Sequence, residues 1–420
     1  MDKLLIEGPA KLKGTVEVSA AKNATLPILA ATLLFEDKIH FHALPELNDV
    51  ATLIKLLQSL GVKVQRNSDN VSVDATHLDH QVADYQLVKT MRASVLVLGP
   101  LLARYHQAKV SLPGGCAIGA RPVDIHLKGL EEMNAKIEIE NGYILAKTDQ
   151  LKGAKIVLSF PSVGATENLM MAAVLAKGET IIENAAQEPE IVDLANFLIF
   201  HGIKISGAGS SRINIQGQSG HLKAKQNNYK VIGDRIEAAT YIIAALMTDS
   251  HVRVEGFEPF ALESVLVNLE KMGAKLKRLD HGVEVFPSGR LKGIMIETAP
   301  FPGFPTDVQA QMMALMSIAE GNSVMTEHIF ENRYMHVPEL TRMGAKIQLK
   351  GSTALIEGVS HLSAAPVMCT DLRASAALVL AALSAKGTSD IQRIYHLDRG
   401  YENLAMKLKN LGAKIDRVKG

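Results

Sequence analysis

Two kinds of helical pattern alternate along the chain. One kind is apolar on nearly every side, as in AATYIIAALM at 238–247 and ASAALVLAAL at 374–383, which is typical of a helix buried all round. The other kind is amphipathic, as in LESVLVNLEKM at 262–272, and predicts a helix with one buried face. The first kind predicts buried helices at 21–34, 91–103, 165–176, 234–247, 307–319 and 371–385.

A short string follows each amphipathic helix and recurs with a nearly constant period. Its glycine fits the position after a helix end, where positive φ is needed and asparagine is the usual substitute. Its lysine opens a strand, and KIEIENGYILA at 136–146 predicts a hairpin with an Asn-Gly turn. A period kept this well indicates an internal repeat. The strings are LGVKV at 60, MNAKI at 133, HGIKI at 201, MGAKL at 272, MGAKI at 343 and LGAKI at 411.

The repeat therefore reads buried helix, strand, loop, amphipathic helix and hairpin, with helices inside and sheets outside. The last repeat stops at KIDRVKG, 414–420, before the second strand of its hairpin. That strand reads LIEG at 355–358 in the fifth repeat, and LIEG also stands at 5–8. We infer that the N-terminal strand completes the last hairpin. An open solenoid of six repeats is the alternative, but a donated strand argues for closure.

This closure predicts two three-repeat α/β domains. One spans 22–229 and carries the cysteine discussed below. The other combines 1–21 with 230–420. The chain then crosses between the domains twice, near 21 and 229, which predicts a hinge and a cleft.

Composition narrows the class of protein. Hydrophobic residues make up 47% and charged residues 21%, as in an ordinary globular protein. A net charge of +1 gives no overall field that would favour nucleic acid or an anionic membrane. Two cysteines suggest a reducing compartment, so we expect a cytoplasmic protein. Residues 1–14 lack a signal-peptide core, and the apolar run at 374–385 is too short to span a bilayer. The sequence shows no P-loop and no metal-ligand spacing, so we expect no cofactor or metal.

Polar residues stand at the predicted starts of the buried helices, where a core helix does not need them. Helix N-termini attract anions through free N–H groups and the macrodipole. We therefore predict an anion site at these starts, with fixed charge from Lys22, Arg92, Arg121, Arg333 and Arg399. For any single arginine, a solvated surface cation is the plainer interpretation. The residues at the starts are Lys22, Asn23, Arg92, Thr166, Glu167, Asp234, Arg235, Asp307, Asp371 and Arg373.

The stretch SLPGGCAIGARPVDIH at 111–126 contains Cys116 among glycines and prolines, which indicates a loop. A thiol near a permanent cation such as Arg121 is more readily ionised. The pair suits a lid that closes over an anion. The alternative for Cys116 is a small buried hydrophobe, which free cysteines often are.

Six motifs carry a resemblance that covers essentially the whole chain. The chain resembles the enolpyruvyl transferases, and within them the members that act on UDP-N-acetylglucosamine. The cysteine loop is not expected in the sister members that act on shikimate 3-phosphate. The resemblance implies two inside-out α/β domains. The motifs are AAKNATLPILAA, LPGGCAIGARPVDIHL, FPSVGATENLMMAA, PFPGFPTDVQAQ, ENRYMHVPEL and LDRGYENL.

The resemblance also implies a reaction. Phosphoenolpyruvate gives its enolpyruvyl group to the 3′-hydroxyl of UDP-N-acetylglucosamine, and phosphate leaves. This is the first committed step of peptidoglycan synthesis, which wall growth, cell shape and division require. Such chemistry needs a proton delivered to a methylene and a proton removed from the hydroxyl. Cys116 is the candidate acid and covalent attachment point, and Asp307 is the candidate base. Asp307 could instead be a helix N-cap, and the two roles are compatible.

Further roles are implied for the substrate-binding residues. Lys22, Arg92, Arg121 and Arg399 should bind the carboxylate and phosphate and stabilise the intermediate. Asn23 should hold the sugar, and Ile329 should contact the nucleotide sugar. Arg333, Asp371 and Arg373 should support the closed site. An epoxide phosphonate resembling phosphoenolpyruvate should alkylate Cys116. The residues expected around the uridine diphosphate are Arg121, Pro122, Val123, Asp124, Ile125, Pro161, Ser162, Val163 and Gly164.

Two other functions stay open at this point. The chain could be an enolpyruvyl transferase for another alcohol, which a uridine-nucleotide binding assay would distinguish. It could also be a non-catalytic relative that binds the nucleotide sugar and regulates the pathway. The presence of Cys116, Lys22 and Asp307 argues against that second alternative.

Overall fold

The computed structural model describes residues 2–67, 69–88, 91–112, 123–218, 220, 222–225 and 228–419, without the side chain of Arg92. These residues form two compact units, which we describe one at a time. Unit 1 comprises 2–19 and 233–419, and unit 2 lies within 20–232. The units change at 19/20 and 232/233, close to the 21/22 and 229/230 boundaries expected from the repeats.

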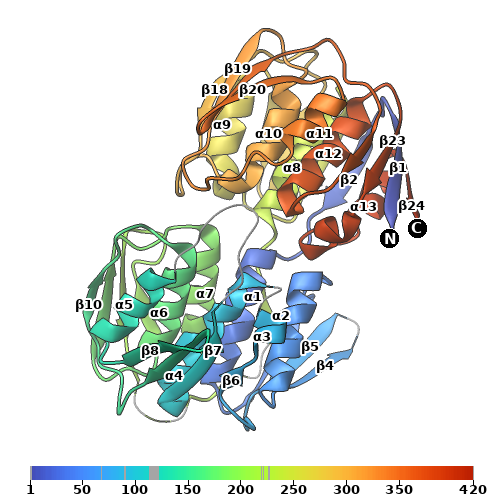
Figure 1. Ribbon diagram of the computed structural model, residues 1–420. Helices are drawn as coiled ribbons and strands as arrows, with labels where there is room; N and C mark the ends of the chain where they lie inside the picture. Colours follow the sequence, from blue (N-terminus) through green and yellow to red (C-terminus); the bar gives the residue numbers. More distant parts are fainter. Residues whose placement is uncertain are drawn as a thin grey trace. The chain divides into compact units, whose positions relative to one another are not determined.

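Helices that are apolar on every side fill the middle of each unit (Figure 1). Every residue of α8 (Arg235–Met247) and α10 (Gln309–Met316) is buried. The buried helices predicted from the sequence pattern are confirmed, although several begin or end in a tighter 3-10 turn. The others are α1 (Lys22–Ala31), α4 (Leu98–Tyr105), α6 (Val163–Ala173) and α12 (Leu372–Ser384), with 3-10 turns η1 (Thr32–Leu34), η2 (Arg92–Val97) and η4 (Thr306–Val308).

Each amphipathic helix is followed, directly after its cap residue, by a residue with positive φ, as the recurring string predicts. Gly273 has φ 102° and Asn134 has φ 74°. Glycine reaches this conformation without a Cβ clash, and asparagine is the common substitute. These helices are α2 (Asn48–Ser59), α5 (Asp124–Glu132), α7 (Pro189–Phe200), α9 (Glu263–Lys271), α11 (Val337–Arg342) and α13 (Leu404–Asn410); shorter helices are α3 (Tyr85–Val88), η3 (Pro259–Leu262) and η5 (Ile394–Arg399).

Within the described ranges, six four-stranded sheets surround these helices and share one strand order. In each sheet a lead strand runs parallel to the next strand, and two further strands complete the sheet in antiparallel fashion. In unit 2 the orders are β14-β3-β5-β4, β6-β7-β9-β8 and β10-β11-β13-β12. The strands are β3 (Lys38–His42), β4 (Lys63–Asn67), β5 (Asn70–Asp74), β6 (Val82–Ala83), β7 (Gln107–Ser111), β8 (Lys136–Glu140), β9 (Tyr143–Lys147), β10 (Lys155–Val157), β11 (Glu179–Glu183), β12 (Lys204–Ser206), β13 (Arg212–Gln216) and β14 (Tyr229–Lys230).

Unit 1 repeats the same sheet design. Its orders are β16-β17-β15-β2, β18-β19-β21-β20 and β22-β23-β1-β24. The strands are β1 (Lys3–Gly8), β2 (Lys13–Glu17), β15 (His251–Glu255), β16 (Lys275–Leu279), β17 (Gly282–Phe286), β18 (Met295–Glu297), β19 (Asn322–Thr326), β20 (Lys346–Lys350), β21 (Thr353–Glu357), β22 (Pro366–Met368), β23 (Gly387–Gln392) and β24 (Lys414–Val418).

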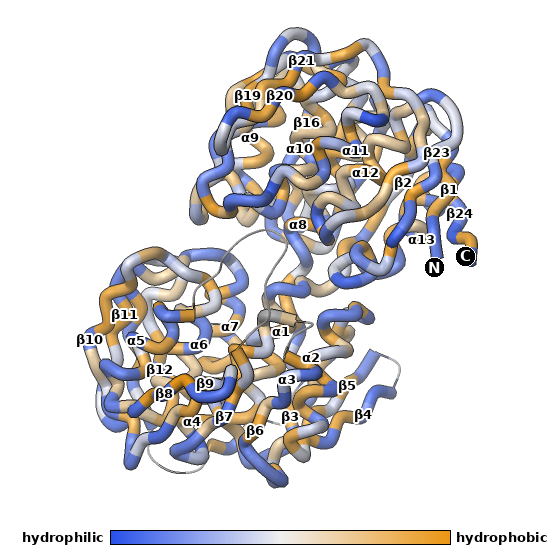
Figure 2. The backbone as a smooth tube through the Cα atoms, in the orientation of Figure 1, coloured by the Kyte–Doolittle hydropathy of each residue, from blue (hydrophilic) through white to orange (hydrophobic). Residues whose placement is uncertain are grey.

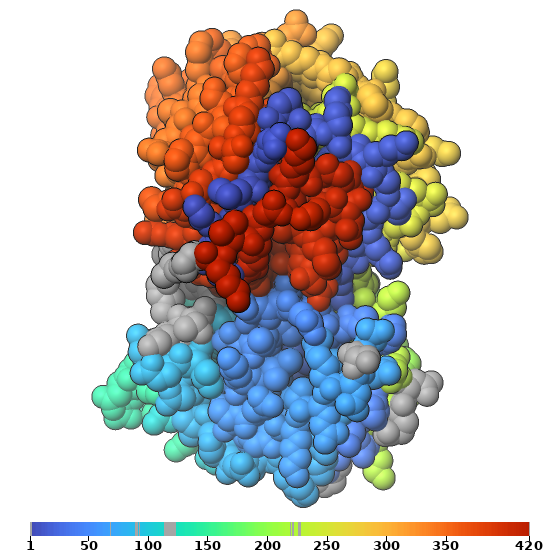
Figure 3. All heavy atoms as spheres, turned by 90° about the vertical axis from the view of Figure 1, so that its right-hand side faces the viewer, coloured from blue at the N-terminus to red at the C-terminus, as the bar shows by residue number. Residues whose placement is uncertain are grey.

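The first strand of the chain lies between two of the last. β1 pairs with β23 on one side and with β24 on the other, so that Ile6 stands opposite Ser389 and Ile415. β1 therefore has the place in its sheet that β21 has in the neighbouring sheet. The space-filling view shows N-terminal residues, in blue, lying against C-terminal residues, in red (Figure 3).

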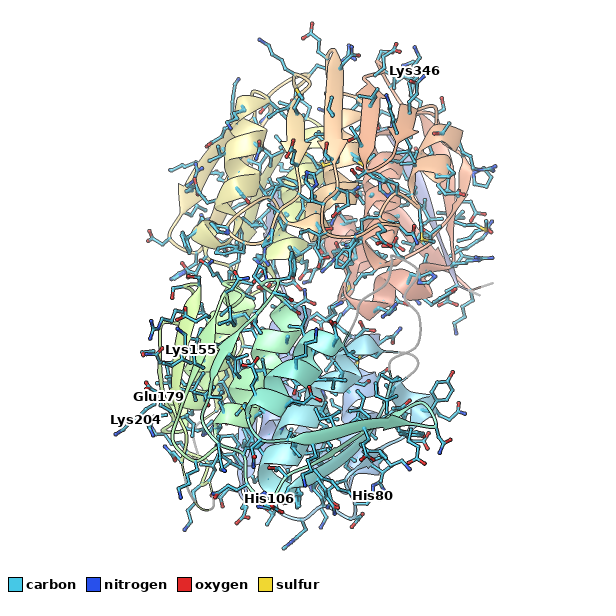
Figure 4. All side chains as sticks on the ribbon, turned by 60° about the vertical axis from the view of Figure 1, so that its left-hand side comes forward. His80, His106, Lys155, Glu179, Lys204 and Lys346 are labelled. Atoms are coloured by element: carbon cyan, nitrogen blue, oxygen red, sulfur yellow. The ribbon has the colours of Figure 1, made fainter. Side chains whose placement is uncertain are left out.

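Along strands such as β11 and β19, buried positions alternate with less buried ones. Both apolar residues, in orange, and hydrophilic residues, in blue, occur along the strands and helices of each unit (Figure 2). Charged side chains project from the outer face of the sheet, as Lys155, Glu179 and Lys204 do on β10, β11 and β12 (Figure 4). The buried positions face the central helices instead. The predicted inside-out α/β class, with helices inside and sheets outside, is confirmed.

The two segments that cross between the units are hydrogen-bonded to each other. Ala21 N–H donates to Ile232 O at 2.7 Å, and Asp234 N–H donates to Ser19 O at 2.8 Å. Carboxylates hold both segments. Asp193 accepts from Ile232 N–H at 3.2 Å, and Glu237 accepts from Ser19 N–H at 2.7 Å. The predicted hinge and cleft stay predictions.

Candidate functional site

Asp307 is the centre of a charged cluster in unit 1. Arg333 donates to Asp307 Oδ1 and Arg373 donates to Oδ2, each at 2.8 Å. Both arginine side chains are 4% exposed, while that of Asp307 is 26% exposed. Such charge-assisted bonds fix geometry strongly, since both arginines are shielded from water. The interpretation as solvated surface cations is therefore wrong for these two arginines.

The alternative role of Asp307 as a helix N-cap is also wrong. Asp307 lies inside the 3-10 turn η4, whose cap residue is Pro305, and no side chain caps that turn. The carboxylate turns to the two arginines instead. By contrast, Asp371 does cap its helix: Oδ1 accepts the N–H of Arg373 at 2.8 Å and of Ala374 at 3.0 Å. This cap fixes the start of α12, from which Arg373 projects.

The charge of Arg373 is maintained by its partners. Burial alone would lower the pKa of Arg373. Nearby negative charges, of which Asp307 has the largest effect, raise this pKa above its ordinary value instead. The guanidinium carbon also lies 5.6 Å from the ring centre of Tyr401, within cation–π range. A buried, permanently charged guanidinium beside Asp307 is the kind of group that stabilises developing negative charge.

Polar bonds join the starts of the buried helices of unit 1. Asp234 caps α8, accepting from Ile236 N–H at 2.8 Å. Gln311 on α10 donates to Thr240 Oγ1 on α8 at 3.3 Å and to the Tyr401 hydroxyl at 3.2 Å. Of the charged cluster, Arg373 stands on α12 and Asp307 on the 3-10 turn η4, whereas Arg333 lies in the turn that precedes α11.

Two further predicted residues of unit 1 lie in connecting segments. Ile329 is half-buried in the loop after β19, and its N–H donates to Glu327 Oε1 at 2.8 Å. Arg399 is half-buried at the end of η5. It lies close enough to His396 that, after burial itself, its charge contributes to the lowered pKa of that histidine.

In unit 2, Lys22 is the first residue of α1, and no side chain caps this helix. Lys22 Nζ lies 3.5 Å from Asp49 Oδ2, with 12% and 8% of the side chains exposed. Asn23 follows and is half-buried. Asp49 was not predicted from the sequence, because it stands in the first turn of the amphipathic helix α2, where an acidic residue is common for helix-dipole reasons alone.

The starts of α5 and α6 lie side by side in unit 2. Ser162 caps α6 by accepting the N–H of Ala165 at 3.3 Å, and Val123 is the cap residue of α5. His126 on α5 is 6% exposed, and its Nδ1 lies 3.1 Å from Asn168 Nδ2 on α6. The segments 123–125 and 161–164, both expected around the uridine diphosphate, are therefore neighbours.

Asn168 is the residue that makes this contact possible. Its Oδ1 accepts the N–H of Gly99 at 2.6 Å, and its Nδ2 also donates to Val95 O at 3.2 Å. Asn168 was not predicted from the sequence, although an amide inside the apolar helix ENLMMAA is itself a signal, since a fully buried polar group needs partners.

Several predicted residues cannot be placed. Cys116, Arg121, Pro122 and the side chain of Arg92 lie outside the described part of the chain. The other cysteine, Cys369, is fully buried, and burial raises its pKa to about 11. In the described ranges, no group of three or more His, Cys, Asp or Glu side chains is arranged to hold a metal ion. None of the described helices combines the length and apolar content that a membrane span requires.

Known proteins resemble the chain along its whole length. A family model described as EPSP synthase (3-phosphoshikimate 1-carboxyvinyltransferase) matches residues 6–408. Proteins of Shewanella amazonensis and Idiomarina loihiensis are each 54% identical to it, with 100% of both chains covered, and a protein of Nitratidesulfovibrio vulgaris is 54% identical with 99% covered. All three are named UDP-N-acetylglucosamine 1-carboxyvinyltransferase.

Solved structures share the fold. The enolpyruvyl transferase NikO of Streptomyces tendae has a TM-score of 0.89 at 24% identity, covering 100% of this chain and 99% of its own. EPSP synthase of Acinetobacter baumannii has a TM-score of 0.77 at 19% identity, covering 100% of both.

The chain therefore belongs to the EPSP synthase family of enolpyruvyl transferases. Within that class, its full-length relatives at 54% identity carry the name UDP-N-acetylglucosamine 1-carboxyvinyltransferase, so the branch indicated by the motifs is confirmed.

Proposed function

We propose that this protein transfers the enolpyruvyl group of phosphoenolpyruvate to the 3′-hydroxyl of UDP-N-acetylglucosamine and releases phosphate, which begins peptidoglycan synthesis. Family membership supports the reaction type, and the names of the relatives support the acceptor. The structural observation that carries the proposal is the Asp307 carboxylate between two buried guanidinium groups. A proton acceptor beside fixed positive charge is what this addition requires.

The reaction has two halves. The acceptor hydroxyl adds to the phosphate-bearing carbon of phosphoenolpyruvate while the methylene carbon gains a proton. The tetrahedral intermediate then loses a proton from the new methyl group and expels phosphate, which restores the double bond. We assign the hydroxyl proton to Asp307 and the methylene proton to Cys116, which also offers a sulfur for covalent attachment.

Charge in this intermediate needs fixed cations. We assign the carboxylate and phosphate of phosphoenolpyruvate to Lys22, Arg92, Arg121 and Arg399. Lys22 meets part of this requirement, since only 12% of its side chain is exposed and a shielded cation acts more strongly than a solvated one. Arg333, Asp371 and Arg373 hold the geometry around Asp307.

The nucleotide sugar needs a separate set of contacts. We assign the sugar to Asn23 and Ile329, and the uridine diphosphate to the starts of α5 and α6. The bond between His126 and Asn168 supports this assignment, because it brings 123–125 beside 161–164. Two helix starts together offer several backbone N–H groups, which suit a diphosphate.

Phosphate release tests the proposal directly. The purified protein is mixed with phosphoenolpyruvate and either UDP-N-acetylglucosamine or shikimate 3-phosphate. We expect phosphate with the nucleotide sugar alone. Phosphate with shikimate 3-phosphate instead would indicate the sister activity named in the family description. Binding of the nucleotide sugar by folded protein without phosphate release would indicate a regulatory relative.

We also propose that the protein works in the cytoplasm, where thiols stay reduced. A reduced thiol matters here because Cys116 has to donate a proton. Fractionation of the producing cell tests this location, and recovery of the protein in a secreted fraction would contradict it.

A further inference from the structure

Glu327 is a buried carboxylate to which the reaction gives no role. It follows β19 directly and is 4% exposed. Its Oε1 accepts from Thr298 Oγ1 at 2.9 Å, from Ile329 N–H at 2.8 Å and from Phe330 N–H at 3.1 Å. Its Oε2 accepts from Thr306 Oγ1 at 2.9 Å. Four donors compensate the cost of burying this carboxylate.

These donors come from two segments that carry proposed site residues. Thr298 and Thr306 stand at the two ends of the turn that leads into η4, and Thr306 immediately precedes Asp307. Ile329 and Phe330 belong to the loop that continues to Arg333. Glu327 therefore joins the segment of the proposed base to the segment of its arginine partner.

Other hydrogen bonds also shape this turn. Ala299 N–H donates to Phe304 O at 3.0 Å, and Gly303 N–H donates to Pro300 O at 2.8 Å. At the near end, Thr298 Oγ1 accepts the N–H of His328 at 2.9 Å. The bond from Thr306 to Glu327 then ties the residue just before Asp307 to the loop after β19.

We propose that Glu327 is a positioning residue for enolpyruvyl transfer, which sets the place of Asp307 through Thr306 and the place of Ile329 through the backbone N–H of that residue. This role rests on the proposed function. The role has two parts with different kinetic consequences. The bond from Thr306, which we call the Thr306 arm, positions the proton acceptor Asp307 and therefore affects the chemical step. The bond from the Ile329 N–H, which we call the Ile329 arm, positions Ile329 and therefore affects binding of the nucleotide sugar.

The Thr306 arm is tested by a change that keeps shape. Thr306→Val removes the hydroxyl and leaves Asp307, Arg333 and Arg373 intact. We expect kcat to fall by roughly 10- to 100-fold, the effect of a misplacement of about 1 Å, with KM for UDP-N-acetylglucosamine within about twofold. Thr306→Ser restores a hydroxyl and should recover most of kcat. A merely structural role would not give this split or this rescue.

The second arm is tested at Glu327 itself. Glu327→Ala should lower kcat and also raise KM for UDP-N-acetylglucosamine, since both arms are lost. The matched control is Asp249→Ala. Asp249 also accepts two backbone N–H groups in unit 1, from Ser288 and Gly289 at 2.9 Å each, but it stands beyond the C-terminal end of α8. This control should lose stability in urea and keep kcat within about twofold.

The outcomes separate this inference from the proposed function. If the unaltered protein turns over but Thr306→Val keeps its kcat, the positioning role is wrong and the function stands. If Thr306→Val and Asp249→Ala lose kcat equally, Glu327 acts only through general stability and the positioning role is again wrong. Absence of turnover in the unaltered, folded protein would overturn the proposed function and this role with it.

Discussion

At the scale of residues, Asp307 is the proposed base and the ion-pair partner of two buried arginines, so loss of its charge should affect both turnover and stability. Asp307→Asn keeps the volume but removes the proton acceptor. We expect turnover to fall by roughly 10²- to 10⁴-fold, while the dissociation constant for UDP-N-acetylglucosamine changes little, because a base acts on the chemical step. Phosphate release and calorimetric titration measure the two quantities.

The variant also leaves Arg333 and Arg373 buried with a neutral partner, which lowers stability. Thermal unfolding must therefore be followed, and assays run where the variant stays folded. Asp249→Asn is the control for loss of a carboxylate in the same unit. Near-normal turnover by folded Asp307→Asn would mean that the base lies elsewhere.

The two cysteines should differ sharply in reactivity. Cys369 is fully buried with a pKa of about 11, so little thiolate exists near neutral pH. We expect an epoxide phosphonate to place a single adduct on Cys116, detected by mass spectrometry, with the same result in Cys369→Ser. Cys116→Asp should keep turnover, with an optimum shifted toward acid, and escape the inhibitor, whereas Cys116→Ser should be much weaker. An adduct on Cys369 would contradict this assignment.

At this scale the charged residues could be predicted from the sequence, but their partners could not. Asp307, Arg333 and Arg373 could be named, because they stand at repeated positions or in motifs. Their mutual bonds could not be foreseen, since those depend on how three segments far apart in the chain pack together. Asp49 and Glu327 were missed because an acidic residue near a helix start or after a strand is locally unremarkable.

At the scale of elements, glycines allow the hairpins to approach the buried helices. A Cβ on Gly358 would lie 1.8 Å from Ala319 O, and one on Gly217 would lie 1.9 Å from Ala176 O. Gly8 meets Ala385 O in the same way, at 2.4 Å. Each of these glycines follows or ends a strand with antiparallel neighbours on both sides, namely β21, β13 and β1, so the strand rests against the C-terminal end of a helix.

Gly358→Ala should therefore destabilise the protein by more than about 3 kcal/mol. The control is Gly344→Ala, where φ is 93° but nothing lies within 4 Å of the added Cβ, so backbone strain of about 1–2 kcal/mol is expected. Urea unfolding compares the two. Equal losses would show that the close approach relaxes at little cost.

The recurring strings made the long helices, their ends and the hairpins predictable. The lead strands escaped prediction because they are as short as two or three residues, as in β6 and β10, and too brief to show alternation. The 3-10 turns at helix ends escaped for a related reason, since their pattern over one turn is that of an α-helix.

The stability of unit 2 should depend on pH through Asp193 on α7, which accepts a hydrogen bond from Ile232 in the second segment that crosses between the units. Burial raises the pKa of Asp193 to about 6, against hydrogen bonds from Tyr229 and Ile232. The folded state then holds this proton more tightly than the unfolded chain, so stability is lost as pH rises from about 4 to about 6. His201 opposes this, because burial lowers its pKa to about 4, and stability is lost as pH falls below about 6.5.

Asp193→Asn removes the first contribution and leaves the second. We expect the variant to gain stability with rising pH between 4 and 6 more steeply than the unaltered protein, by up to about 1.4 kcal/mol per pH unit. Denaturant unfolding at a series of pH values measures the difference. Parallel curves for the two proteins would contradict the raised pKa.

At the scale of the whole molecule, β1 is the first strand of the chain in sequence but lies between the C-terminal strands β23 and β24 in the fold. Lys3 stands opposite Val418, and the ends of the chain are marked side by side in Figure 1. A permuted chain can therefore begin at Pro9 and run through residue 420 directly into residues 1–8. Residues 419, 420, 1 and 2 would then form the turn of an ordinary hairpin, as in the other repeats.

We expect this permutant to fold and to release phosphate at a rate close to that of the unaltered chain. Deletion of residues 1–8 without relocation should instead abolish cooperative unfolding of unit 1, because β24 loses its neighbour and the sheet its third strand. Circular dichroism with urea unfolding checks both chains. Failure of the permutant to fold would mean that β1 is needed at the start of the chain itself.

The placement of β1 also fixes an order of events during synthesis. A ribosome makes β1 and β2 first, yet their partners β15, β23 and β24 are made after residue 250. All of unit 2 emerges in between. The nascent chain therefore carries two unpaired strands for most of its translation, and such edges are prone to aggregate. We expect the earliest residues made to be among the last protected, which would make this protein dependent on chaperones that hold nascent N-termini.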